Sequence, residues 1–125
     1  MKKILFSLLL LIGAVGTLAA EEISSIDSTG SWIYLYNSKG QKYKTLSVSS
    51  VGTVVGYSST FFVSVSSSGS WIYLYDADGK RYQTLSSSSV GDVIGVAGNT
   101  FTSRKGGWIY MWDKDGKKIN TRAAP

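Results

Sequence analysis

The chain contains no cysteine and no histidine, and only one of its 125 residues is proline. Without cysteine it can form no disulfide, offers no thiol nucleophile and has no lipoprotein attachment site. Without histidine it lacks the usual general base and the commonest transition-metal ligand. The sequence therefore disfavours an enzyme, and no cofactor is expected.

The chain also lacks a strong net charge of either sign. Residues 21–125, which follow the signal peptide predicted below, contain 11 Lys and Arg against 8 Asp and Glu, a net charge of +3. The basic residues are scattered and form no run of five or more. A solvated surface accounts for this pattern, so no nucleic acid is expected as a partner.

A typical secretory signal peptide occupies residues 1–20. Lys2 and Lys3 form its basic start, an apolar run follows from Ile4 to Ile12, and small residues end it at Ala20. The apolar run is shorter than the ~20 residues that a membrane span needs. We expect export to the periplasm or beyond, no membrane span after cleavage, and a single mature domain at residues 21–125.

The mature chain repeats itself. The phrase GSWIYLY occupies Gly30–Tyr36 and recurs unchanged at Gly69–Tyr75, and GGWIYMW follows at Gly106–Trp112. Between residues 30–56 and 69–95, eighteen of 27 positions are identical. Successive copies begin 39 and then 37 residues apart. Such periods indicate a repeat fold whose units bury their apolar faces against one another.

Each repeat divides into short strand-like pieces. In the second copy these pieces are WIYLYD, RYQTLS, DVIGVAG and TFTSRKG, all bounded by Gly, Ser, Asn or Asp. No stretch has helical periodicity, so no helix is expected, and the Ser-rich patches at 47–50 and 86–89 are predicted as loops. The prediction is eleven strands, grouped as three, four and four, with the first three at Glu22–Asp27, Trp32–Tyr36 and Lys42–Leu46.

The link between the first two pieces predicts a hairpin turn. NSKG, DADG and DKDG each end in a glycine suited to positive φ, namely Gly40, Gly79 and Gly116. The Asp-x-Asp-Gly spacing also resembles the start of a calcium loop. That loop requires a Glu at its twelfth position, where the second copy has Ser87. A turn is therefore favoured, and no metal site is predicted.

The repeat can also be read as a unit that begins at VGDVIGVAG instead of at the aromatic phrase. A small-residue strand at Val93–Ala97 and a second at Thr100–Ser103 then precede a strand that ends in aromatic-Asp, here Trp112-Asp113. Read in this way, the unit resembles a blade of the WD40 and quinoprotein-like β-propellers. The resemblance implies an all-β fold of three tandem four-stranded antiparallel repeats, placed at about 22–60, 61–99 and 100–125. It implies no activity, and the histidine-containing network of WD40 blades is absent.

Eleven strands leave the closure of the fold open. Propellers close with four to eight blades, so two chains together would supply a six-bladed ring as a homo-oligomer. A β-trefoil, built from three four-stranded units, would close within one chain. The WIYLY strand is apolar on both faces, which favours sheets sandwiched between sheets. A β-solenoid is a third possibility, disfavoured by the charges and glycines of every turn.

The aromatic residues divide into expected core and expected site. The tryptophans that begin the phrase, Trp32, Trp71 and Trp108, are expected in the core. Residues near the strand ends and the turns are candidates for binding carbohydrate or peptide. These candidates are Tyr36, Tyr75, Trp112, Tyr43, Tyr82, Lys44 and Arg81.

Three hypotheses about function follow. The first is an exported, non-enzymatic binding module with one site per repeat. The second is a structural envelope protein that self-associates and has no small-molecule ligand. The third is a hydrolase or lyase that uses Asp92 or the turn carboxylates, and the missing general bases rank it last.

Overall fold

The structure is a computed structural model that describes residues 21–125. The predicted signal peptide at residues 1–20 lies outside the described residues. Within the described part, no helix has the length and apolarity needed to cross a membrane.

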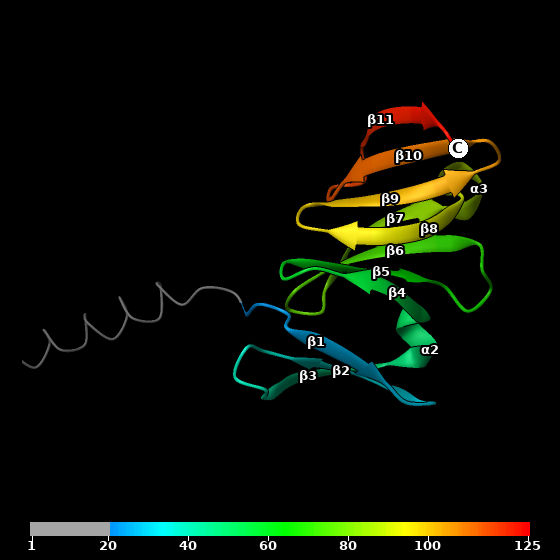
Figure 1. Cartoon of the computed structure of the whole chain (residues 1–125). Coiled ribbons are helices and arrows are strands. Elements are labelled where there is room, and N and C mark those ends of the chain that lie inside the picture. The colour runs from blue at the N-terminus through cyan, green and yellow to red at the C-terminus, as the bar shows by residue number, and fades with distance from the viewer. Residues whose placement is uncertain (1–20) are drawn as a thin grey trace, which may run out of the picture.

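Three separate antiparallel sheets stack along the chain (Figure 1). They contain three, four and four strands, which confirms the predicted grouping. The first sheet has β1 (Ser25–Ser28), β2 (Trp32–Tyr36) and β3 (Lys42–Ser47). The second has β4 (Thr53–Tyr57), β5 (Phe61–Val65), β6 (Trp71–Asp76) and β7 (Arg81–Ser86), and the third has β8 (Asp92–Ala97), β9 (Thr100–Lys105), β10 (Trp108–Asp113) and β11 (Lys118–Ala123).

The sheets are open and do not close into one barrel. Strand order follows the chain within each sheet, as it does in a blade-repeat β fold. The arrangement is therefore the predicted tandem antiparallel one and not the trefoil alternative. The chain passes from the first sheet to the second at residues 48–52 and from the second to the third at residues 87–91. Each of the sequence units 22–60 and 61–99 therefore contributes strands to two sheets.

Two one-turn helices carry the chain from one sheet to the next. They are α2 (Val48–Val51) and α3 (Ser87–Val90), and they lie in the Ser-rich patches that were predicted as loops. The expectation of no helix is wrong here, because one turn is too short to show periodicity. The side chains of Ser47 and Ser86 cap the two turns by accepting from the backbone N–H three residues on.

The hairpin turns confirm the predicted turn chemistry. Gly79, which ends the turn between β6 and β7, has φ of 84°. Asp76 Oδ1 accepts from the backbone N–H groups of Asp78 and Lys80 at 2.9 and 3.0 Å. Asp113 does the same in the third sheet. The first aspartate of each Asp-x-Asp-Gly segment therefore holds its own turn together.

Each sheet has two unlike apolar faces. The aromatic face carries Trp, Tyr and a second aromatic from the phrase, and the aliphatic face carries Ile with Leu or Met. Ile33 and Leu35 of the first sheet pack with Phe62 and Tyr75 of the second in one buried cluster. A second cluster joins the aliphatic face of the second sheet to the aromatic face of the third. The prediction that the phrase is apolar on both faces is confirmed.

The prediction that the first tryptophan of each copy lies in the core is wrong. Trp32, Trp71 and Trp108 are 48%, 46% and 51% exposed. Each begins its strand and pairs with the last residue of the neighbouring outer strand, such as Ser47 for Trp32. Trp71 and Trp108 therefore lie at the end of a sheet, beyond the cover of the preceding sheet, and within residues 21–125 no sheet precedes that of Trp32. The buried tryptophan is Trp112, at 7% exposure.

A buried serine ties each complete sheet to the helical turn before it. Ser64 Oγ donates to the Val51 carbonyl at 2.8 Å, and Ser103 Oγ donates to the Val90 carbonyl at 2.7 Å. In the third sheet Trp112 Nε1 also donates to Ser103 Oγ, at 2.9 Å. Ser103 therefore serves two buried partners and Ser64 one.

Replacing the two serines by alanine tests this difference. Ser64→Ala leaves one buried carbonyl without its partner and is expected to lower the free energy of unfolding by about 1 kcal/mol. Ser103→Ala leaves both a carbonyl and an indole N–H, so a loss of about 2 kcal/mol or more is expected. Urea unfolding followed by circular dichroism measures both losses. Equal losses would contradict the double role of Ser103.

Candidate functional site

Three exposed tryptophans lie at equivalent places, each on the same face as a tyrosine that contacts a basic residue. We call each group an aromatic platform: Trp32, Tyr34 and Lys42 in the first sheet, Trp71, Tyr73 and Arg81 in the second, and Trp108, Tyr110 and Lys118 in the third. Trp and Tyr are two residues apart on one strand, so both side chains lie on the aromatic face. Every copy of the repeat thus presents the same three kinds of side chain.

A β-bulge places the basic residue on each platform. In the second sheet Leu74 pairs with Gln83, but the next residue, Tyr75, pairs with Arg81. Tyr82 is the extra residue, and the same shift occurs in the other two sheets. Such a bulge redirects neighbouring side chains. Here it brings Arg81 over the tyrosine of the aromatic face.

The basic groups make cation–π contacts with the platform tyrosines. Lys42 Nζ lies 4.3 Å from the centre of the Tyr34 ring, and Lys118 Nζ lies 4.1 Å from that of Tyr110. The Arg81 guanidinium carbon lies 4.2 Å from the ring centre of Tyr73. These contacts hold each cation over the tyrosine while its N–H groups remain able to donate, and in the second sheet Arg81 and Trp71 line the same hollow.

Shallow hollows accompany two of the platforms. Trp71, Tyr73, Arg81 and Thr84 line a hollow of about 190 Å³. In the first sheet Trp32, without Tyr34 or Lys42, lines a hollow of about 390 Å³ whose other residues include Ser31, Ser47 and Ser49. Each hollow offers an aromatic surface with hydroxyl groups at its edge. Such a combination is suited to an amphipathic ring, which can stack on the aromatic surface and form hydrogen bonds.

The seven predicted site residues lie in different surroundings. Tyr75 and Trp112 are buried between sheets, whereas Tyr36 is half-buried on the first sheet. Lys44 is exposed, and its aliphatic carbons lie against the turn at Gly79. Of the seven, Arg81 is on a platform. Tyr75 and Trp112 are thus core residues of the sheet contacts.

Tyr43 and Tyr82 connect each sheet to the next. Tyr43, the bulge residue of β3, donates its hydroxyl to the Ala77 carbonyl in the turn of the second sheet, at 2.7 Å. Tyr82 donates in the same way to the Lys114 carbonyl in the turn of the third sheet. The equivalent position in the third sheet is Ile119, which is 52% exposed. The two tyrosines therefore brace the stack.

Burial perturbs the two bracing hydroxyls. Desolvation, helped by the charges of Glu21, Asp78 and Asp76, raises the pKa of Tyr43 to about 12. Desolvation, with Asp115 as the nearest charge effect, raises the pKa of Tyr82 to about 12. Burial also raises the pKa of Tyr75. Each shift keeps the hydroxyl protonated, as its role as a donor requires.

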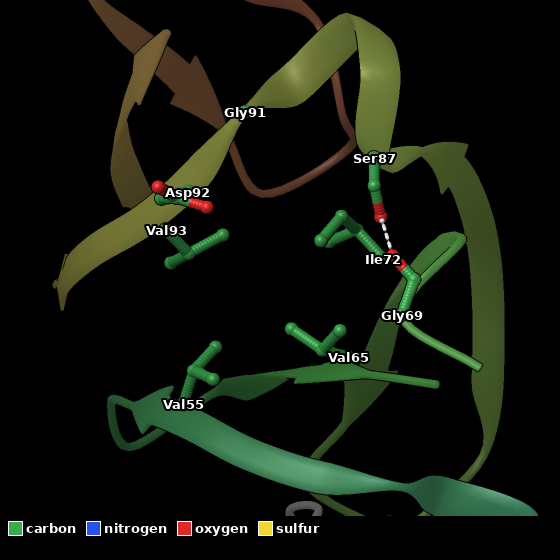
Figure 2. Close-up of a pocket in the computed structure, with 8 residues that line it drawn as sticks. All are labelled: Val55, Val65, Gly69, Ile72, Ser87, Gly91, Asp92 and Val93. Atoms are coloured by element: carbon green, nitrogen blue, oxygen red, sulfur yellow. Dashed lines mark hydrogen bonds between the residues drawn. The ribbon is translucent and has the colours of Figure 1, made fainter. Parts of the chain in front are cut away.

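A small apolar pocket lies between the second and third sheets (Figure 2). Its volume is about 230 Å³. Val55, Val65, Ile72 and Val93 line it, and the Ser87 hydroxyl at its side donates to the Gly69 carbonyl at 2.7 Å. Asp92 is the only titratable residue of its lining. One carboxylate without a second acid or base does not form the pair used in glycoside hydrolysis.

Over residues 21–125, no three side chains of the kind that ligate metals come together. Asp76 and Asp113 use Oδ1 to accept backbone N–H groups of their own turns. The candidate site of the described chain is therefore the set of platforms.

The chain matches no protein-family model and no curated protein.

The sequence contains a signal for the platforms in the alternation of the repeated phrase. In WIYLY the aromatic residues occupy alternate positions, so Trp, Tyr and Tyr share one face and Ile and Leu the other. A tryptophan directly after Gly-Ser or Gly-Gly begins its strand, where coverage by a neighbour is least. The bulge that adds the basic residue has no comparable signal in a single sequence.

The pKa values of the bracing tyrosines predict a loss of stability in alkali. In the unfolded chain these hydroxyls titrate near 10, whereas in the folded chain Tyr43 and Tyr82 titrate near 12. Between these pH values the folded state retains protons that the unfolded state has lost. The contribution of these two tyrosines to the free energy of unfolding is therefore fully present below pH 10 and is lost as pH rises towards 12.

Urea unfolding over that pH range, with near-ultraviolet absorbance to follow tyrosinate, measures the effect. A Tyr43→Phe/Tyr82→Phe double variant is less stable at neutral pH but shows a shallower decline above pH 10. An unchanged slope in this variant would rule out the bracing tyrosines as the source.

Proposed function

We propose that the protein is an exported, non-enzymatic binding module that recognises carbohydrate through its three aromatic platforms. The observation that carries the proposal is the threefold recurrence of a half-exposed tryptophan on the same sheet face as a tyrosine that contacts a basic residue. Burying a tryptophan would stabilise the fold, so a repeated exposed one is best explained by a ligand.

The chemistry of a platform suits a sugar ring. The C–H groups on one face of a pyranose are weakly positive and stack on the negative face of an indole. Hydroxyl or carboxylate groups at the edge of the sugar accept hydrogen bonds from Arg81 or from the lysines at its position. Thr84 and its counterparts Thr45 and Thr121, which pair with the platform tyrosines, add hydroxyl groups.

The number of platforms supports a polymeric ligand. Each hollow is shallow, so a single platform would bind weakly. Three sites on one rigid stack raise the apparent affinity for a repeating glycan by ~10²–10⁴ over one site. A polysaccharide of the cell envelope or of the surroundings fits a protein with a predicted signal peptide.

Replacing the platform tryptophans tests the proposal. The probe is an array of neutral and uronic-acid oligosaccharides and polysaccharides, read with the wild-type protein. A Trp71→Ala variant is expected to bind a polyvalent glycan about tenfold more weakly or worse. A Trp32→Ala/Trp71→Ala/Trp108→Ala variant is expected to lose binding, because no stacking surface remains.

Tyr57→Ser is the matched control, because Tyr57 is a large exposed aromatic residue outside the platforms. This variant retains wild-type binding. Absence of binding to every glycan, or equal binding by the triple tryptophan variant, would overturn the proposal.

A further inference from the structure

The two contacts between sheets are copies of each other, and they leave two complementary faces unused. In both contacts an aliphatic face packs on an aromatic face. Within residues 21–125, no further sheet covers the aromatic face of the first sheet or the aliphatic face of the third. Tyr36 is accordingly half-buried, whereas its counterpart Tyr75 is buried. On both unused faces the strand of the repeated phrase keeps the residue pattern that packs elsewhere in the molecule, whereas residues of the neighbouring strands differ.

The unused face of the third sheet carries two arginines in place of aliphatic residues. Ile109 is flanked across the strands by Arg104 and Arg122. In the second sheet Val65 and Leu85 flank the equivalent Ile72 and pack in the buried cluster. Both arginines are exposed. Asp92 lies beside Arg104, so two arginines stand against one carboxylate on this face.

The unused face of the first sheet carries a carboxylate in the place of a buried serine. Asp27 pairs with Tyr34 as Ser64 pairs with Tyr73 and Ser103 with Tyr110. Ser64 and Ser103 donate to helical turns that the first sheet does not have in the described chain. Asp27 is exposed.

The substitutions on the two faces match in position. Val65 in the second sheet is the counterpart of Arg104, and it lines the same pocket as Gly91. Gly91 directly follows Val90, whose carbonyl accepts the hydrogen bond of Ser103. Val65 therefore lies near the place of Ser103 in this contact. In a third copy of this contact Arg104 would lie near Asp27, the counterpart of Ser103. Within residues 21–125 the first sheet has no helical turn at this place, which leaves room for the longer side chain.

We propose that two copies of the chain associate head to tail, with the aliphatic face of each third sheet on the aromatic face of the other first sheet and with Arg104 paired to Asp27. Two copies contribute six sheets, within the four to eight at which sheet rings close. Three copies would contribute nine. Both contacts of the ring are then the same, and no sheet face stays uncovered.

This association is independent of the carbohydrate proposal. Trp71 and Trp108 remain half-exposed although a preceding sheet covers their aromatic face. Trp32 would remain exposed in the dimer in the same way. The dimer would therefore present six platforms, and either proposal can fail without the other.

Charge reversal tests the proposal on the full chain, expressed and purified as exported protein. Light scattering and analytical ultracentrifugation are expected to give twice the mass of one chain for the wild type. Asp27→Arg and Arg104→Asp place like charges at both contacts, and each variant is expected to raise the dimer dissociation constant about thirtyfold or more. Circular dichroism checks that each variant is folded.

Restoration of the pair makes the test specific. The double variant Asp27→Arg/Arg104→Asp is expected to dimerise again. An equimolar mixture of the two single variants is also expected to dimerise, because one contact is then native and the other reversed. Lys105→Asp is the control, since it has the same change of charge as Arg104→Asp on the opposite face, and it stays dimeric. A monomeric wild type, an open-ended polymer, or single variants that dimerise normally would overturn the proposal.

Discussion

The structure depends on the packing of an aliphatic sheet face against an aromatic one. A three- or four-stranded sheet of this length cannot bury enough apolar surface alone, so each sheet is stabilised by its neighbour. The repeated phrase supplies both halves of the contact, because Ile and Leu alternate with the aromatic residues along one strand. One strand can therefore serve two interfaces, and repetition of the strand extends the stack without new chemistry.

Much of this fold follows from the sequence. The number and grouping of the strands, the hairpin turns and the two-faced character of the phrase are all encoded by local alternation and by Gly and Asp in the turns. The helical turns α2 and α3 were not predicted, because four residues are too few to show helical periodicity. Their capping serines also could not be distinguished from the neighbouring serines. The strands and hairpin turns, which recur in every repeat with clear residue patterns, were predictable, whereas the one-turn helices were not.

The site was harder to predict because exposure depends on the ends of the sheets. The tryptophans were assigned to the core from their size, although they begin their strands and lie beyond the cover of the neighbouring sheet. Tyr75 was assigned to a site and lies in the core, because the same face is covered a few residues further along. Position along the strand, rather than residue type, decides which aromatic residues meet solvent.

The bulge in the outer strand of each sheet separates two tasks that would otherwise compete. One extra residue lets Arg81 cover the platform tyrosine while the adjacent Tyr82 reaches the turn of the next sheet. A substitution at Arg81 changes the charged group over the platform tyrosine, whereas the hydrogen bond of Tyr82 to the next sheet is retained. The first and third sheets have lysine there. Each copy of the repeat can therefore carry a different cation on its surface without a change in how the sheets are joined.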